Sequence, residues 1–213
     1  MTSGSATKRA KGRSKRTDTL HQVQTEQQAV HRRHRLIVAG IWTAAVLVVA
    51  GLVTAALMSS RPTQDTASRV APDFTLTDSD GASHTLSALR GHPVLLYFSE
   101  GAGCDACIVQ QAKIEAEPGF AAAGITELPI VMNTAAQINA DRQRLGAKDA
   151  FLLDDGTVSQ QYGVLGTGMH ANLPGHGFVL VDAAGNQVWK GDYPSMWIDP
   201  KDLLGIVESH LTR

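Results

Sequence analysis

Cysteine is scarce in this sequence, and so are aromatic residues. The 213 residues include two cysteines, and Phe, Trp and Tyr together make up 5%. Two cysteines are too few for a small secreted fold that depends on several disulfides. The chain also lacks a second long apolar run, which excludes a membrane protein with several spanning helices. With 43% apolar residues, it is too hydrophobic to be disordered throughout.

Positive charge is concentrated at one end of the chain. Residues 1–35 contain nine Lys or Arg residues and two acids, whereas residues 70–213 contain eight Lys or Arg residues and seventeen acids. The net charge of −1 therefore hides two segments of opposite sign. The basic segment has no interleaved aromatic residues and no periodic apolar face. We predict a disordered cytoplasmic tail that binds no nucleic acid and serves as a topology signal beside anionic lipid.

Residues 36–58 are uncharged and rich in Leu, Ile, Val and Ala. As a helix they would be about 34 Å long, enough to cross the hydrocarbon core of a bilayer. A basic cluster ending at Arg35 precedes them, and Arg61 is the one base close behind, so the C-terminal part is expected outside the cytoplasm. A cleaved signal peptide is the alternative, but its charged and apolar regions would be shorter. We predict an uncleaved, single-pass anchor in the cell membrane.

Residues 59–69 are polar and are predicted to form a flexible linker, which leaves residues 70–213 as the folded domain. Within that domain, the apolar patterns and turn residues predict buried strands at 93–98 and 128–132, helices at 104–117 and 134–145, a hairpin at 177–190 and a helix at 200–211. This order predicts an α/β domain with a mixed sheet flanked by helices. The first half of the sheet should be parallel and its last hairpin antiparallel.

The two cysteines form a CxxC motif, Cys104-Asp105-Ala106-Cys107, between a predicted buried strand and a predicted helix. As a structural disulfide it would close a very short loop and add little stability. As half of a zinc site it lacks a second CxxC. A redox role has a physical basis, because Cys104 at a helix N-terminus would be favoured as a thiolate and Cys107 would lie one turn further. We predict a redox-active pair, with metal transfer and a structural role as alternatives.

Several blocks of the sequence resemble the thioredoxin-like redoxins, which include the AhpC/TSA peroxiredoxins and the membrane-tethered TlpA/ResA-type thiol-disulfide oxidoreductases. The blocks are Ala71–Leu76, Leu89–Gly91, Pro93–Phe98, Leu153–Gly156 and Phe178–Asp182. The resemblance covers about residues 70–211 and implies the thioredoxin fold. It also implies dithiol-disulfide exchange without a further cofactor, with Cys104 attacking and Cys107 resolving. No GxGxxG motif follows a strand, so a partner protein is expected to recycle the pair.

Three features depart from this family. The aromatic residues that usually precede the CxxC are replaced by a segment beginning with Glu100, which becomes a candidate modulator of the site. Gly101 stands where a peroxiredoxin has Thr or Ser, three residues before its peroxidatic cysteine. His176 lies six residues before Asp182, where thioredoxin-fold proteins have a cis-proline.

His176 is therefore expected near the thiols and in a trans peptide bond. It would stabilise a thiolate if protonated and could ligate a metal if neutral. His170 is expected to be an exposed loop residue.

These observations predict a membrane-tethered thiol-disulfide oxidoreductase that exchanges disulfides with extracytoplasmic proteins. One alternative is a module that binds copper or another soft metal through Cys104, Cys107 and His176. A weaker alternative is a thiol peroxidase that uses Cys104.

Overall fold

The computed structural model describes residues 4–168 and 170–211, with side chains from residue 32 onward. The chain divides into two units, Met1–Leu57 and Met58–Arg213. Helix α1 (Gly4–Ser59) makes up the described part of the first unit. The second unit holds the predicted domain, and each unit is described by itself.

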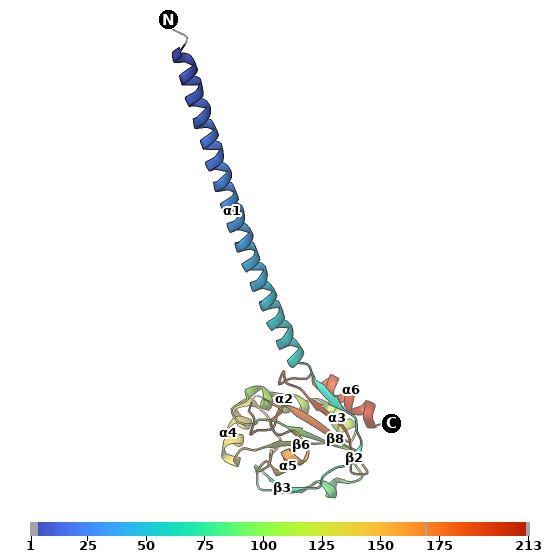
Figure 1. Ribbon diagram of the computed structural model, residues 1–213. Helices are drawn as coiled ribbons and strands as arrows, with labels where there is room; N and C mark the ends of the chain where they lie inside the picture. The colour runs from blue at the N-terminus through green and yellow to red at the C-terminus, as the bar shows by residue number, and fades with distance from the viewer. Residues whose placement is uncertain (1–3, 169, 212–213) are drawn as a thin grey trace. The chain divides into compact units, whose positions relative to one another are not determined.

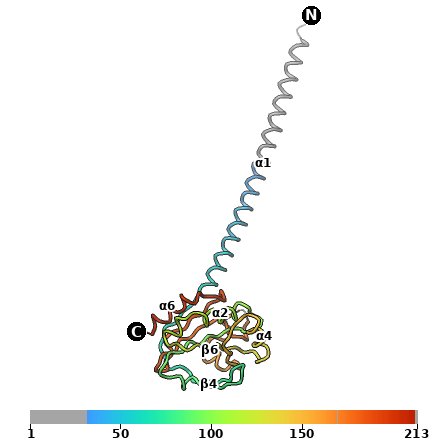
Figure 2. The backbone as a smooth tube through the Cα atoms, turned by 180° about the vertical axis from the view of Figure 1, so that it is seen from behind, coloured from blue at the N-terminus to red at the C-terminus, as the bar shows by residue number. Residues whose placement is uncertain are grey.

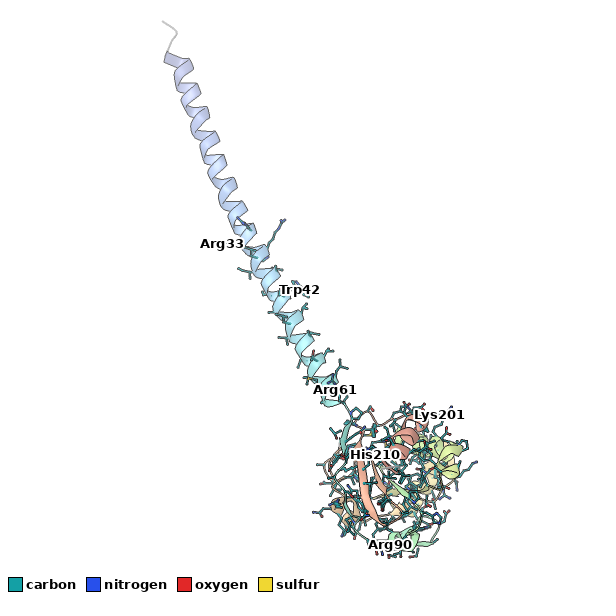
Figure 3. The ribbon with its side chains drawn as sticks, turned by 90° about the vertical axis from the view of Figure 1, so that its right-hand side faces the viewer. Arg33, Trp42, Arg61, Arg90, Lys201 and His210 are labelled. Atoms are coloured by element: carbon teal, nitrogen blue, oxygen red, sulfur yellow. A yellow bond between two sulfur atoms is a disulfide. The ribbon has the colours of Figure 1, made fainter. Side chains whose placement is uncertain are left out.

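Helix α1 contains the apolar segment. Among the described residues, one stretch is long and apolar enough to cross a membrane by length and composition, Arg32–Ser59. Its apolar side chains are exposed, and Trp42 points away from the helix (Figure 3). The predicted disorder of residues 1–35 is wrong for the backbone from Gly4 onward, which is helical. This segment lacks proline and is rich in Gln, Lys, Arg and Ala, so a helix that starts in the apolar segment extends readily.

One mixed sheet forms the centre of the second unit. Its strands are β1 (Thr63–Asp65), β2 (Arg69–Val70), β3 (Thr75–Asp78), β4 (Ser83–Thr85), β5 (Val94–Phe98), β6 (Thr126–Val131), β7 (Leu152–Leu153), β8 (Gly177–Val181) and β9 (Asn186–Asp192). They follow the order β1-β9-β8-β5-β6-β7-β3-β4, and β2 also pairs with β9. Strands β5, β6 and β7 are parallel, whereas β8 and β9 form an antiparallel hairpin. The predicted mixed sheet is confirmed.

Helices cover both faces of this sheet (Figure 1). They are η1 (Leu86–Leu89), α2 (Asp105–Glu115), α3 (Pro118–Ala122), α4 (Ala135–Leu145), α5 (Thr157–Gln161) and α6 (Pro200–Leu211). Successive side chains of β5 point to opposite faces, so Tyr97 packs in the cluster that contains residues of α2, α3 and α6, while Phe98 packs in the cluster that contains Val158 of α5. Figure 2 shows α2 and α6 at the end of the domain opposite β4.

The segment 59–69 is not the flexible linker that its composition predicts. Strand β1 extends the sheet along β9, with Thr63 opposite Asp192, and Trp189 Nε1 donates to Gln64 Oε1 at 3.3 Å. An edge strand exposes a row of unpaired backbone groups, which β1 and β2 cover here. The folded domain therefore includes part of the predicted linker.

The ends of two helices are set by local residues. Thr134 caps α4 through a capping box with Gln137, and Gly146 ends the helix with a φ of +83°. These limits confirm the predicted helix. The helix expected at 104–117 ends earlier, at Glu115, because Pro118 starts the separate helix α3.

Candidate functional site

The CxxC motif occupies the start of α2. Cys104 is the N-cap residue and is half-buried, whereas Cys107 is fully buried one turn into the helix. The two form a disulfide. Unpaired N–H groups and the helix dipole lie beside Cys104, so in the reduced protein they favour a thiolate there. The predicted placement of the two cysteines is confirmed, and their chemical roles stay a prediction.

Two residues from neighbouring elements hold the loop before Cys104. The N–H of Ala102 donates to Asn133 Oδ1 at 2.8 Å, and the N–H of Gly103 donates to Asp141 Oδ2 at 3.0 Å. Neither acceptor is recognisable as a site residue in the sequence, because polar residues are common on surfaces and after strands. The available signal for Asn133 is its position after β6, since parallel neighbours such as β5 and β6 end at the same edge of a sheet.

Gly101 has no room for a side chain. Its φ is +72°, a conformation that favours glycine. A Cβ atom there would collide with Asn133 Oδ1 and would lie 2.8 Å from Val131 Cγ1. The hydroxyl that peroxiredoxins carry three residues before their cysteine therefore does not fit this backbone.

Gly101→Ala is expected to lower the free energy of unfolding by roughly 2–4 kcal/mol, because backbone strain and overpacking add. Gly103→Ala is the matched control. Its φ is +95°, but a Cβ there meets nothing within 4 Å, so strain alone should cost about 1–2 kcal/mol. Chemical denaturation of the full chain in detergent measures both losses. Equal losses would show that Gly101 is not crowded.

His176 is buried beside Tyr97, whose hydroxyl contacts the backbone of the motif. The Tyr97 hydroxyl donates to the carbonyl oxygen of Cys107 at 3.0 Å and lies 3.1 Å from His176 Nδ1. Because a hydroxyl has one proton, Nδ1 is assigned as the protonated nitrogen that donates to the Tyr97 oxygen. The Gly175–His176 bond is trans, as expected, since the described residues contain no cis peptide.

The structure corrects two expectations for His176. Burial lowers its pKa to about 4, so the ring is neutral at pH 7 and does not stabilise a thiolate as a cation. Its hydrogen bond is with Tyr97, and through Tyr97 it reaches the carbonyl of Cys107. Among the described side chains, no group of three His, Cys, Asp or Glu residues is placed to hold a metal ion. The soft-metal ligand set of Cys104, Cys107 and His176 is therefore not assembled here.

Glu100 is a buried carboxylate four residues before Cys104. It is 6% exposed, and its Oε2 lies 2.9 Å from Nδ1 of His170, whose side chain is 61% exposed. The loop that carries His170 folds back on itself, with the N–H of Gly166 donating to the carbonyl of Leu173 at 2.8 Å. His170 is therefore exposed, as expected, but it is also bonded to the carboxylate that the sequence marks as a modulator.

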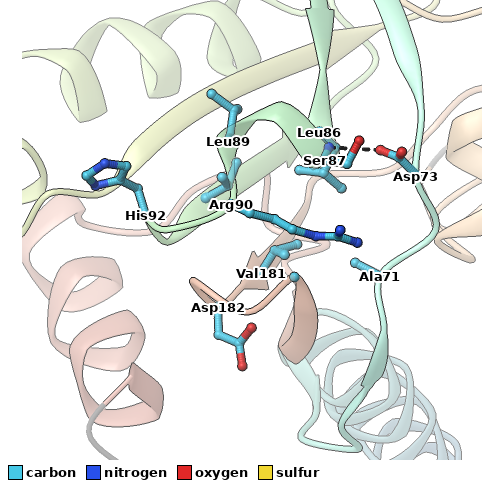
Figure 4. A pocket seen from close by; sticks show the side chains of 11 residues that line it. Ala71, Asp73, Leu86, Ser87, Leu89, Arg90, His92, Val181 and Asp182 are labelled. Atoms are coloured by element: carbon cyan, nitrogen blue, oxygen red, sulfur yellow. Dashed lines mark hydrogen bonds between the residues drawn. The ribbon is translucent and has the colours of Figure 1, made fainter.

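A small pocket beside η1 lies apart from the cysteine loop. Arg90 extends across it near Ser87 (Figure 4), and the N–H of Ser87 donates to Asp73 Oδ1 at 2.9 Å. Hydrogen bonds from Ser87 and the charge of Arg90 lower the pKa of Asp73. The pocket is lined by segments 71–94 and 181–185 and has a volume of about 20 Å³, which suits a single water molecule. Its lining residues lie outside the cysteine loop.

A mixed sheet with helices on both faces, and a CxxC disulfide at the start of a helix that follows a central strand, define a thioredoxin-fold redox protein. The AhpC/TSA family matches residues 67–189, and the chain belongs to this family. It is 30% identical over 118 residues to chloroplastic peroxiredoxin Q of Triticum aestivum, a match that covers 54% of each chain. The chain thus spans about half the length of the curated relatives it matches.

Solved structures with a similar fold include a peroxidoxin and a disulfide oxidoreductase. Peroxidoxin BcpB of Mycobacterium tuberculosis has a TM-score of 0.57 and 19% identity, and the match covers 68% of this chain and 97% of that one. A secreted disulfide oxidoreductase of Mycobacterium tuberculosis has a TM-score of 0.50 and 22% identity, with 64% and 95% covered. At these identities the likeness shows the fold alone, so the activity must be argued from the site.

Proposed function

We propose that this chain is a membrane-tethered thiol-disulfide oxidoreductase that exchanges disulfides with proteins outside the cytoplasm. The observation that carries this proposal is the unequal exposure of the two cysteines, because Cys104 is accessible at the helix start and Cys107 is not. An accessible sulfur is needed to meet a protein client. The buried sulfur of Cys107 does not meet a client and reacts only with the Cys104 sulfur beside it.

In the reducing direction, the Cys104 thiolate attacks a client disulfide and forms a mixed disulfide, and one client sulfur leaves as a thiolate. Cys107 then loses its proton and attacks the Cys104 sulfur. This step breaks the mixed disulfide, releases the second client thiolate and forms the Cys104–Cys107 disulfide. The client gains two electrons that the dithiol loses, and a partner dithiol must reduce the new disulfide before the next cycle.

Peroxidase activity is the second candidate, because curated relatives are named peroxiredoxin Q. The crowded, left-handed Gly101 argues against it, since the position that would carry the activating hydroxyl cannot hold one. Both activities need a reactive Cys104, so reactivity alone does not distinguish them.

The deciding experiment uses the full chain, reduced, in detergent. It is mixed in parallel with a protein disulfide and with hydrogen peroxide, and oxidation of the Cys104–Cys107 pair is followed by mass. The proposal expects the protein disulfide to oxidise the pair at least about 100-fold faster than peroxide does at equal concentration, because the hydroxyl donor that would assist the reaction with peroxide is missing at Gly101. Faster oxidation by peroxide would support the peroxidase instead.

The orientation in the membrane is also part of the proposal. It rests on the basic cluster before the span, which ends at Arg35, against the single nearby Arg61 behind it. After mild reduction of intact cells, a membrane-impermeant maleimide should label Cys104. Labelling that requires cell lysis would place the cysteines in the cytoplasm and refute the orientation. A mass shorter by residues 1–56, which end at the small residues Thr54-Ala55-Ala56, would indicate a cleaved signal peptide.

A further inference from the structure

Arg144 of helix α4 binds Asp105, the residue that directly follows Cys104 in the CxxC motif. Arg144, in the last turn of α4, donates from Nη1 to Asp105 Oδ2 at 3.0 Å and from Nη2 to Asp105 Oδ1 at 2.5 Å. This two-pronged geometry fixes both the position and the orientation of the Asp105 carboxylate. Asp105 is the first residue of α2, so this bidentate ion pair holds in place the helix turn that begins at Cys104.

The same guanidinium also acts on the other side of Cys104. Its Nε and Nη2 donate to Asp141 Oδ1 at 3.2 and 2.9 Å, and Asp141 Oδ2 accepts the N–H of Gly103 at 3.0 Å. Arg144 therefore holds the residues on both sides of Cys104. It binds Asp105 directly, and it is linked to Gly103 through Asp141. Although Arg144 is 39 residues from Asp105 in the sequence, its side chain fixes the backbone on both sides of the attacking cysteine.

The charges in this cluster bear on the thiolate. Asp105 and Asp141 each bring a negative charge close to Cys104, which disfavours a thiolate. Arg144 supplies one positive charge against these two negative ones, and its hydrogen bonds lower the pKa of both carboxyl groups. All three side chains are partly exposed, at 51% for Arg144, 61% for Asp105 and 21% for Asp141. Exposed ion pairs add little to stability, so replacing Arg144 should leave the fold intact and allow its effect on Cys104 to be measured.

We propose that Arg144 is the positioning residue of the CxxC centre, which holds the Cys104 turn in place and offsets the two aspartates beside the thiolate. This inference rests on the proposed function, since it gives Cys104 the role of attacking thiol. It makes the ion pair between α2 and α4 a determinant of the rate at which Cys104 reacts.

The test measures the pKa of Cys104 in the full chain in detergent, from the pH dependence of alkylation. A Cys107→Ser background leaves one thiol to report. Arg144→Gln is expected to raise the pKa by about half a unit and to slow alkylation about threefold at pH 7, the size of effect that Coulomb's law gives in water for unit charges several ångströms apart. Arg144→Lys, which keeps the charge, should lie nearer the wild type than Arg144→Gln does. The shift should shrink in 1 M salt.

Arg142→Gln is the matched control. Arg142 lies on the same helix and also pairs with an aspartate, Asp80, but it does not contact the cysteine loop. It should leave the pKa of Cys104 unchanged. An unchanged pKa in Arg144→Gln at low salt overturns the inference, and so do equal shifts in both variants. Client exchange by the wild type is measured separately, so its absence would refute the proposed function without deciding the role of Arg144.

Discussion

Cys107→Ser is expected to trap the chain in mixed disulfides with its clients, whereas Cys104→Ser is not. Cys104 is half-buried at the start of α2 and can meet a client sulfur, while Cys107 is fully buried. Well-oriented intramolecular groups react with effective molarities on the order of 10⁵ M, so replacing Cys107 leaves only dilute external thiols to release the client. Release should slow by at least about 1,000-fold.

The trapped species is measured as a higher-mass band that disappears on reduction, with the full chain expressed in its own membrane. Ala106→Ser is the matched control, because it places a hydroxyl at an exposed neighbouring position and leaves both cysteines in place. It should turn over as the wild type does and trap nothing. If both cysteine variants trapped clients equally, or if neither did, the assignment of attacking and resolving thiols would be wrong.

The sequence predicts those features that leave a local pattern. The apolar run of β5, the glycines after it and the CxxC together indicate a strand that turns into a helix, and the structure has this arrangement. Thr134 and Gln137 form the capping box of α4. Thr134 can be recognised from the sequence as the N-cap residue of this helix. Such features depend on neighbours within a few residues, and pattern reasoning detects them for that reason.

Other features leave no local pattern. Strand β1 is exposed at all three positions, so it lacks the apolar alternation by which strands are recognised. The hydrogen bond of His176 reaches Tyr97 across 79 residues, and Arg144 reaches Asp105 across 39. Contacts of this kind depend on how the helices pack on the sheet. The sequence places the two cysteines correctly but does not reveal the residues that hold them.

His176→Gln is expected to remove roughly 3 kcal/mol of destabilisation that the wild-type fold suffers when the pH falls from 7 to 4. Burial lowers the pKa of His176 to about 4, against about 6.5 in an unfolded chain. Between these values the unfolded chain binds a proton that the folded chain does not, so lowering the pH favours unfolding. The stability that the neutral ring maintains is fully present above pH 6.5 and is lost as the pH falls to 4. The loss amounts to roughly 3 kcal/mol for a difference of this size.

The measurement is the free energy of unfolding of the full chain at pH 7 and at pH 4, in wild type and variant. Glu127, whose pKa is raised to about 8 mainly by burial, gives the opposite dependence between pH 4.5 and 8, but both proteins share it. The difference between them therefore isolates His176 and should change by about 3 kcal/mol in favour of the variant at pH 4. His92→Gln, at an exposed histidine, is the control and should keep the wild-type profile. A difference that stays constant from pH 7 to pH 4 would mean that the His176 ring takes up its proton in the folded chain as readily as in the unfolded one.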